Sequence, residues 1–320
     1  MYNNLMKKIL ITGIHGSGAT YLAEYLDTVP DLEIHGISRW HTDRQIKSEL
    51  FNKLHIHECD LTDLGSVIRA LEISQPDYIF HLAANANVKL SFTSPSSVLN
   101  NNINGTVNLL EGLRILNLKP VLQLCGTSEV YGQVKKEEIP IKETQNIDPV
   151  NVYAISKFVQ EKLVKSYYNS YGIPIMITRA FGYINPRRPD IFSSAFAKQI
   201  VDIERGKKKI LHHGDLNSIR TLLDVRDVME AYWVGANKCK YGEAYNIGST
   251  IPVKVGDYLE ELKKHANCEI VCETDHNLLR PVDVTLQIPD VNKFYEATNW
   301  KPRYTFEETM QFLLDYYRNQ

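Results

Sequence analysis

Residues 8–19 read KILITGIHGSGA, a short apolar run that passes at once into a turn with three glycines. The run Lys8–Thr12 is typical of a buried β-strand, and Tyr21–Asp27 after the turn is typical of a helix. At such a junction, backbone N–H groups and the helix dipole can meet a pyrophosphate, although a plain tight turn uses similar residues. The place of the motif at the first strand favours a dinucleotide site. The residues that we expect to contact the dinucleotide here are Gly13, His15, Gly16, Ser17, Gly18 and Ala19.

The alternation of strand and helix patterns continues to about residue 180. This alternation predicts an α/β protein with a Rossmann-type, doubly wound parallel sheet and helices on both faces. The expected strands are Glu33–Ser38, Leu54–Cys59, Tyr78–Leu82, Val121–Cys125 and Ile175–Arg179, and the expected helices are Leu64–Ile73, Val98–Leu116 and Val152–Tyr171.

The pattern changes after Phe181, where prolines divide the chain into shorter pieces. We therefore expect a dinucleotide-binding domain over residues 1–180 and a smaller C-terminal substrate-binding lobe over residues 181–320. A strand near residues 243–248 is expected to return to the main sheet. Helices are expected in the lobe at Ile191–Arg205, Val225–Asn237 and Val255–Ala266.

The residues after the second strand indicate which dinucleotide binds. An Asp or Glu at this point would accept hydrogen bonds from the ribose of NAD, but the sequence has Ser38-Arg39-Trp40. Arg39 could pair with a 2′-phosphate, and Trp40 or Arg39 could cover the adenine, so we expect NADP rather than NAD. A solvated surface arginine is the alternative. Asp60, after the third strand, is placed to reach the adenine edge.

Two residues in the long helix after the fifth strand have the spacing of an acid–base pair. Tyr153 and Lys157 are four apart, so their side chains share one helix face. A nearby ammonium favours the phenolate, so we expect it to lower the pKa of Tyr153. The tyrosine could then take a proton from a hydroxyl group while hydride leaves its carbon. An ordinary exposed pair is the alternative, and the position after a fifth strand argues against it.

The fifth strand ends in CGTSEVYG, residues 125–132. Side chains at the carboxyl end of a parallel strand face the ligand crevice, so Thr127 can hydrogen-bond the reacting oxygen. Glu129, two residues on, could serve as base or acid, or be a surface carboxylate at a helix start.

These motifs together resemble the extended short-chain dehydrogenase/reductases over nearly the whole chain. The shared features are the glycine turn, HLAA at 81–84, NGT at 104–106, YxxxK at 153–157, Arg280-Pro281 and WKP at 300–302. Within that superfamily the chain is most similar to the GDP-mannose 4,6-dehydratase family. The matching segments are YLAEYL at 21–26, TSE at 127–129 and PRR at 186–188.

The resemblance implies a nucleotide-sugar 4,6-dehydratase, a lyase that uses NADP and acts on GDP-mannose or a related GDP-sugar. It implies a catalytic set of Thr127, Ser128, Glu129, Tyr153 and Lys157, in which Tyr153 and Lys157 also contact the cofactor. It adds cofactor contacts at Leu61, Leu82, Ala83 and Ala84. The guanidinium fork matches phosphate oxygens, so the resemblance also implies substrate binding by cationic side chains. These are Arg187, Arg188, Lys198, Arg220 and Arg280.

Several residues depart from the dehydratase pattern. Ala19 stands at the usual third glycine, and Gly182 stands where an asparagine usually contacts substrate phosphate. Asn85 and Asn87 replace more usual residues beside the expected nicotinamide crevice. A GDP-4-keto-6-deoxy-sugar reductase, whose group resembles residues 196–204 and 224–227, and a 4-epimerase therefore remain alternatives. A catalytically silent NADP-binding protein is the rival from another class.

The composition limits the other classes of function. The 320 residues are 43% hydrophobic and carry a net charge of −2, so we expect neither nucleic-acid nor membrane binding. There is no signal-peptide pattern, and the five cysteines form no CxxC, which favours reduced thiols in the cytoplasm. No His or Cys pair has partners that complete a metal site. The family resemblance implies a homodimer through helices 98–116 and 152–171, or a homotetramer.

Overall fold

The computed structural model describes residues 6–39, 48–279 and 284–320. Its main feature is a seven-stranded sheet in the order β11-β6-β5-β4-β1-β2-β3, in which every pairing is parallel. The strands are β1 (Lys7–Thr12), β2 (Leu32–Ser38), β3 (His55–Glu58), β4 (Tyr78–His81), β5 (Val121–Thr127), β6 (Ile175–Ala180) and β11 (Ala244–Ile247). The strand order reverses between β1 and β4, which confirms the predicted Rossmann-type fold.

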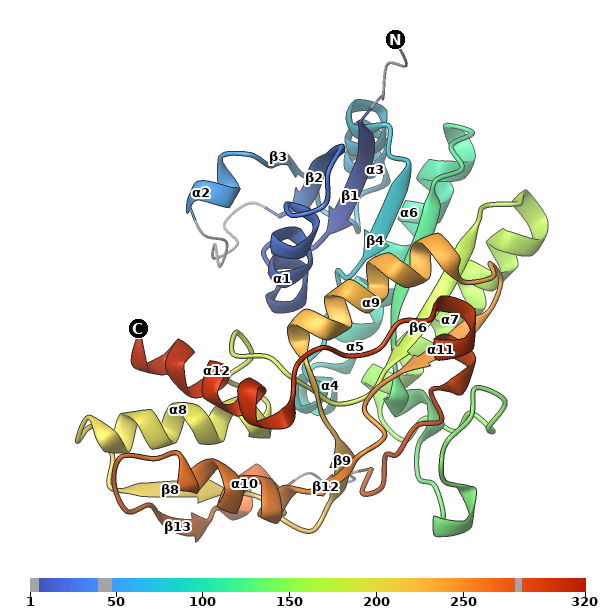
Figure 1. The fold of residues 1–320 in the computed structure, drawn as a ribbon. Helices are drawn as coiled ribbons and strands as arrows, with labels where there is room; N and C mark the ends of the chain where they lie inside the picture. Colours follow the sequence, from blue (N-terminus) through green and yellow to red (C-terminus); the bar gives the residue numbers. More distant parts are fainter. Residues whose placement is uncertain (1–5, 40–47, 280–283) are drawn as a thin grey trace.

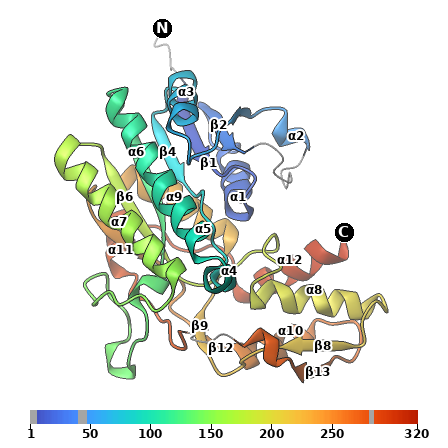
Figure 2. The same ribbon diagram turned by 180° about the vertical axis from the view of Figure 1, so that it is seen from behind.

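Both faces of the sheet are covered by helices, as Figures 1 and 2 show from opposite sides. Successive residues of a strand point to opposite faces, so Ile9 and Ile11 enter one hydrophobic core and Leu10 enters the other. One face is covered by α1 (Ser17–Leu26), α9 (Val225–Lys238) and α11 (Asn292–Thr298). The other is covered by α3 (Leu64–Ser74), α6 (Gly105–Ile115) and α7 (Val152–Tyr171).

The second half of the chain contributes to this sheet. The expected return strand is present as β11, which pairs with β6, and α9 and α11 pack on the sheet beside α1. The division into two domains at residue 180 stays a prediction. The structure adds that three later elements, β11, α9 and α11, return to the sheet domain. Among the residues described, the smaller lobe therefore consists mainly of elements that do not touch the sheet.

The smaller lobe has its own hydrophobic core, centred on Phe196, Tyr258 and Leu314. It is built from α8 (Phe192–Glu204), β8 (Ile210–His213), α10 (Val255–Lys264), β13 (Val271–Thr274) and α12 (Phe306–Arg318). Two small ladders lie between it and the sheet domain, and Figure 1 labels the strands of the second one. They are β7 (Tyr183–Ile184) with β10 (Leu223–Asp224), and β9 (Ile219–Thr221) with β12 (Pro252–Lys254).

The helix expected over 98–116 has a different interior from the prediction. It begins earlier, as α5 (Pro95–Leu99), passes through a π-helical turn η1 (Asn100–Asn104) and continues as α6. The Asn102 carbonyl accepts from the Thr106 hydroxyl and from the Gln160 amide of α7. The hydroxyl of Thr106 and the amide of Gln160 thus satisfy the Asn102 carbonyl in the π-helical turn. Because Gln160 belongs to another helix, the periodicity of the sequence does not reveal this turn.

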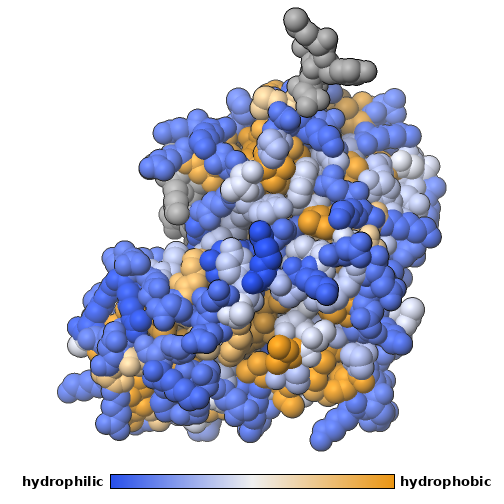
Figure 3. Space-filling model, viewed as in Figure 1, coloured by the Kyte–Doolittle hydropathy of each residue, from blue (hydrophilic) through white to orange (hydrophobic). Residues whose placement is uncertain are grey.

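The remaining elements are short, and the surface is mixed. They are α2 (Ser48–Phe51), α4 (Val88–Thr93), η2 (Ser128–Tyr131), η3 (Lys136–Glu138) and η4 (His276–Leu278). Figure 3 shows a face that is mainly hydrophilic, with hydrophobic atoms in separate patches. Within the described ranges, no helix combines the length and the apolar character that a membrane crossing requires.

Candidate active site

The glycine turn lies between the carboxyl ends of β2 and β4. Its position is fixed by two backbone bonds, because Gly13 and Ile14 both donate to the Ile37 carbonyl at 3.0 and 3.1 Å. A Cβ at Gly13, which has a φ of +69°, would lie 3.0 Å from the Ala83 backbone. A Cβ at Gly36 would lie 2.7 Å from the Ile14 side chain. Glycine at both positions therefore lets the turn sit directly on the sheet edge.

The turn presents the start of α1 in a form suited to an anion. Its N-cap, Gly16, makes no side-chain cap, and the first turn contains no acidic residue. The positive end of the helix dipole thus faces outward without a protein carboxylate, which fits a pyrophosphate. The predicted residues of the turn lie together here, with Leu82 and Ala83 at the end of β4 beside them. Their contacts with a dinucleotide stay a prediction.

Arg39 and Asp60 follow the neighbouring strands β2 and β3. Asp60 accepts from the Thr62 backbone N–H and hydroxyl at 2.9 and 2.8 Å. These bonds, the backbone one above all, and the charge of Arg39 lower the pKa of the Asp60 carboxyl. Asp60 is thus an ionised acceptor, and exposed Arg39 is a cation within its electrostatic reach. Leu61 packs beside Gly105, whose Cβ position is 3.2 Å from it.

The catalytic residues expected from the sequence meet where β5 ends and α7 begins. Thr127, Tyr153 and Lys157 are 8%, 9% and 3% exposed, and the Thr127 side chain is near enough to Tyr153 to lower its pKa. Burial raises the pKa of Tyr153 and lowers the pKa of Lys157. The expectation of a lowered tyrosine pKa is therefore wrong for this structure, because desolvation of the phenolate outweighs the nearby positive charge. The cation that favours the phenolate here is Arg188.

Glu129 is fixed to the start of the helix that carries Tyr153. The Asn151 amide donates to Glu129 Oε2 at 3.1 Å, and Asn151 Oδ1 caps α7 by accepting from Ala154 N at 2.8 Å. Thr127 Oγ1 accepts from Glu129 N at 3.3 Å, and Ser128 beside them is buried. Our reading of the sequence overlooked Asn151, although an asparagine just before a helical pattern is an N-cap signal.

A buried polar chain runs behind the site from the glycine turn to α7. His81 bonds Thr12 Oγ1 at 2.8 Å and Thr106 Oγ1 at 2.9 Å. Asn102, one turn before Thr106, donates to Ser156 Oγ at 2.9 Å. Burial lowers the pKa of His81 to about 3, so the ring is neutral. These bonds tie the glycine turn to the helix that carries Tyr153 and Lys157 without introducing a charge.

The two neighbouring arginines of the PRR segment have different surroundings. Arg187 is 8% exposed and donates to Thr20 Oγ1 at 2.7 Å and to Glu24 Oε1 at 2.6 Å. Its guanidinium also lies 3.9 Å from the centre of the Tyr21 ring. All three partners belong to α1, so Arg187 is engaged in holding the lobe connection against the sheet domain. A role in substrate binding stays a prediction for this residue.

Arg188 lies on the crevice side. It makes a two-pronged ion pair with Asp190 at 2.7 and 2.8 Å, and Asn87 donates to the same carboxylate at 3.3 Å. The charge of Arg188 acts on the hydroxyls of Tyr153 and Tyr183. Of the two arginines, Arg188 is thus the one beside the reacting centre.

The other expected substrate ligands are spread over the lobe. Arg220 is buried on β9, where it donates to the Ile219 carbonyl at 3.1 Å, and Lys198 is exposed on α8. Arg280 lies outside the described residues, as does Trp40. The substrate-binding roles of Arg220 and Lys198 stay predictions.

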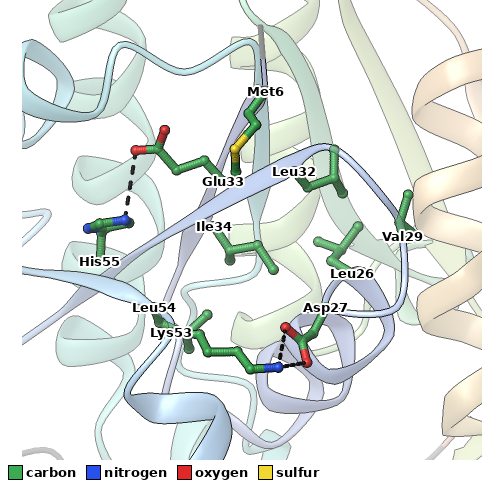
Figure 4. A pocket seen from close by; sticks show the side chains of 10 residues that line it. All are labelled: Met6, Leu26, Asp27, Val29, Leu32, Glu33, Ile34, Lys53, Leu54 and His55. Carbon is green, nitrogen blue, oxygen red and sulfur yellow. Dashed lines mark hydrogen bonds and ion pairs between the residues drawn. The ribbon is translucent and has the colours of Figure 1, made fainter. Parts of the chain in front are cut away.

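A cavity of about 200 Å³ lies at the opposite edge of the sheet (Figure 4). It is lined by the end of α1 and the starts of β2 and β3, and Glu33–His55 and Lys53–Asp27 pairs border it. Ligands of open α/β sheets bind at the carboxyl ends of strands, and small-molecule pockets usually exceed roughly 300 Å³. We therefore place the active site at the crevice and not in this cavity. Among the described residues, no cluster of three metal-binding side chains is present.

Comparison with known proteins agrees with this geometry. The family model of GDP-mannose 4,6 dehydratase matches residues 10–313. GDP-mannose 4,6-dehydratase of Yersinia enterocolitica is 29% identical over 344 residues, covering 95% of this chain and 91% of the relative. GDP-6-deoxy-D-mannose reductase of Pseudomonas aeruginosa is 30% identical over 241 residues, covering 75% and 79%.

A solved structure shows the same likeness in three dimensions. RMD from Pseudomonas aeruginosa complexed with NADPH superposes with a TM-score of 0.84 at 26% identity, over 98% of this chain and 99% of that one. Sheet order, glycine turn and TSE–YxxxK centre all agree with the family match, and we conclude that this chain belongs to the GDP-mannose 4,6-dehydratase family.

Proposed function

We propose that the chain is an NADP-dependent 4,6-dehydratase of GDP-mannose or a related GDP-sugar. The observation that carries this proposal is the Asn151 bridge, which holds the Glu129 carboxylate at the same helix terminus as Tyr153. Oxidation at a sugar carbon needs only a tyrosine, whereas loss of water needs a second acid–base group beside it. The relatives named GDP-mannose 4,6-dehydratase support the substrate class.

NADP fits the residues that would hold it. The uncapped start of α1 suits the pyrophosphate, and β2 is followed by Ser38 and Arg39 rather than by a carboxylate. Arg39 would pair with the 2′-phosphate, and Asp60 would accept from the adenine edge. The similar structure of RMD with NADPH supports this choice. When bound, the cofactor supplies the hydride acceptor for C4 and the hydride donor for C6.

The protein's own groups would handle the protons. Thr127 would hydrogen-bond the C4 oxygen. Burial raises the pKa of Tyr153, so this residue would take the C4 hydroxyl proton only as a phenolate, the form that the charge of Arg188 favours. The C4 ketone acidifies the C5 proton. Glu129 would remove that proton and pass it to the C6 hydroxyl, which leaves as water. Tyr153 would then return the proton that it took from the C4 hydroxyl to C5. No net oxidation occurs, so the buried centre must retain the ketone and exclude water between the steps.

The deciding experiment incubates the purified protein with GDP-, CDP-, UDP- and dTDP-sugars without added reductant and follows the products by mass. Loss of one water from a GDP-sugar is the expected result. In the same assay Glu129→Gln should lower dehydration by about 10²–10⁴-fold while NADP binding is kept, and Tyr153→Phe should block the hydride step. Full dehydratase turnover by Glu129→Gln would refute the role of this carboxylate.

A reductase of a GDP-4-keto-6-deoxy-sugar is the second candidate, favoured by the relative that is 30% identical. The same panel separates the two. Turnover of a keto-sugar only, and only with added NADPH, would replace the dehydratase proposal with this one.

For substrate binding we propose that Arg188, with Arg220, Lys198 and Arg280, forms the cationic lining for the nucleotide diphosphate. Arg187 would act through α1 by holding the lobe connection in place. We further propose that residues 1–180 and 181–320 form the cofactor and substrate parts, with β11, α9 and α11 returned to the first.

We also propose a homodimer, with a homotetramer as the larger alternative, in the cytoplasm. The helices expected at the dimer interface carry large hydrophobic side chains that are partly exposed: Ile115, Ile155 and Tyr171 at 48%, 41% and 46%. All five cysteines are free in the structure, in keeping with a reducing compartment. Light scattering of the purified protein tests the assembly.

A further inference from the structure

Tyr183 lies between the glycine turn and the reacting centre, yet the mechanism above does not use it. Its side chain packs against the core, and its hydroxyl lies with the side chains of Leu82 and Met229 around Gly18 at the start of α1. A Cβ built at Gly18 would lie 3.8 Å from the Tyr183 hydroxyl. The absence of a side chain at Gly18 therefore leaves room for this phenol.

The backbone fixes Tyr183 in this place. It begins β7, where it is paired with Leu223 of β10, and Leu223 N donates to the Gly182 carbonyl at 3.1 Å. A Cβ at Gly182 would lie 2.6 Å from the Thr221 carbonyl oxygen, so only glycine permits this close approach. The phenol is thus directed toward α1 before any ligand binds.

The polar end of Tyr183 lies among groups of the reacting centre. The charges of Arg188 and Asp190 act on its hydroxyl in opposite directions, and the Tyr183 hydroxyl in turn raises the pKa of Tyr153. Burial raises the pKa of Tyr183 to about 12, so the hydroxyl keeps its proton at neutral pH and can donate it in a hydrogen bond. A donor thus stands beside the uncapped start of α1, where the dipole already favours an anion.

We propose that Tyr183 is a further cofactor-binding residue, whose hydroxyl donates a hydrogen bond to a pyrophosphate oxygen of the bound dinucleotide. This inference rests on the proposed cofactor, but it does not depend on which sugar is processed. It gives the crevice a side-chain donor opposite the backbone N–H groups of α1. The contact would orient the nicotinamide half between the glycine turn and Tyr153.

The test measures dissociation constants by calorimetry for wild type, Tyr183→Phe and Tyr183→Met. Both variants remove the hydroxyl and keep an apolar side chain, and circular dichroism melting checks their fold. The matched control is Tyr258→Phe, which loses a buried hydroxyl bonded to the Ser193 carbonyl at 3.2 Å in the smaller lobe. The three ligands are NADP⁺, 2′-phospho-ADP-ribose, which lacks only the nicotinamide, and 2′-AMP, which lacks the pyrophosphate.

We expect Tyr183→Phe to weaken NADP⁺ and 2′-phospho-ADP-ribose by about tenfold or more, the loss typical of one hydrogen bond to a charged oxygen. Binding of 2′-AMP, and all binding by Tyr258→Phe, should stay within twofold of wild type. An NADP⁺ affinity unchanged in both Tyr183 variants overturns the proposal, as does an equal loss for 2′-AMP. A loss for NADP⁺ alone would move the contact to the nicotinamide and overturn the phosphate assignment.

The outcome is separable from that of the proposed function. A protein that binds NADP⁺ through Tyr183 but dehydrates no GDP-sugar would refute the dehydratase proposal and leave this one standing. Failure of the wild-type protein to bind any of the three ligands would overturn both.

Discussion

The ion pair between Arg179 of β6 and Glu161 of α7 allows a quantitative test of what holds the catalytic helix on the sheet. Arg179 Nε lies 3.0 and 3.2 Å from the two carboxylate oxygens, and Nη2 lies 2.7 Å from Oε2. The side chains are only 7% and 4% exposed, so solvent screens the pair little. Arg179 also donates to the Tyr131 hydroxyl and the Glu143 carbonyl, at 3.0 and 3.1 Å.

Arg179→Met leaves the Glu161 charge buried without a partner. Removing one member of such a pair typically costs about 3–5 kcal/mol of unfolding free energy, because the remaining charge stays desolvated. In the double variant Arg179→Met/Glu161→Leu no charge is left. Its expected cost is only about 1–2 kcal/mol, mainly for the donors that Tyr131 and Glu143 lose. The double variant should therefore be more stable than the single one.

Urea denaturation at pH 7, followed by circular dichroism, measures the free energies of unfolding for the double-mutant cycle. The matched control is Arg114→Met, which removes the exposed Arg114–Glu111 pair of the neighbouring helix and should leave the midpoint unchanged. If the double variant is as unstable as Arg179→Met or less stable, then the cost does not come from an uncompensated buried charge. The reasoning would then be refuted.

Three further predictions follow from single positions. Asn151→Ala removes the α7 cap, so it should cost about 0.5–2 kcal/mol in a thermal melt. It should also slow mass-detected dehydration by releasing Glu129, and an unchanged rate would remove Asn151 as a positioning residue. The pKa of His81, about 3 when folded, lies below its ordinary value, so the unfolded chain binds the proton more readily. Its contribution is complete above roughly pH 6.5 and falls by up to about 1.4 kcal/mol per pH unit as the pH drops toward 3. Calorimetric melting at pH 7 and pH 5 checks this, and His81→Gln should flatten the difference. Gly182→Asn restores the usual family residue, but its Cβ would lie 2.6 Å from the Thr221 carbonyl oxygen. It should lower the melting temperature rather than tighten substrate binding, and a tighter, stable variant would contradict the packing argument.

Much of the sheet domain could be predicted from local patterns. The buried run ending at Thr12, the following glycines and the helix after them depend on neighbours in the chain, and the structure has them as expected. The spacing of Tyr153 and Lys157 placed both on one face of α7 for the same reason. The interior of the helix that begins at Pro95 was not predictable, because the π turn depends on a donor from α7.

The pKa values and ion-pair partners of the site residues could not be predicted from the sequence. The lowered pKa that we expected for Tyr153 rested on one neighbouring charge, whereas the raised pKa follows from how completely α7 and β5 bury the phenol. The split between Arg187 and Arg188 is of the same kind. Two adjacent arginines look equivalent in sequence, but the chain turns so that one meets Glu24 of α1 and the other meets Asp190.

By itself, then, the sequence determined the sheet architecture, the glycine turn after β1 and the position of Tyr153 and Lys157 on one face of α7, since periodicity and spacing act over a few residues. Only the tertiary structure decided that Asn151 holds Glu129, that Arg188 faces Tyr153, and that Gly18 leaves room for Tyr183. The burial of a side chain and its hydrogen-bond or ion-pair partners depend on segments that are distant in the chain. Local sequence patterns do not show how close these segments come in the fold.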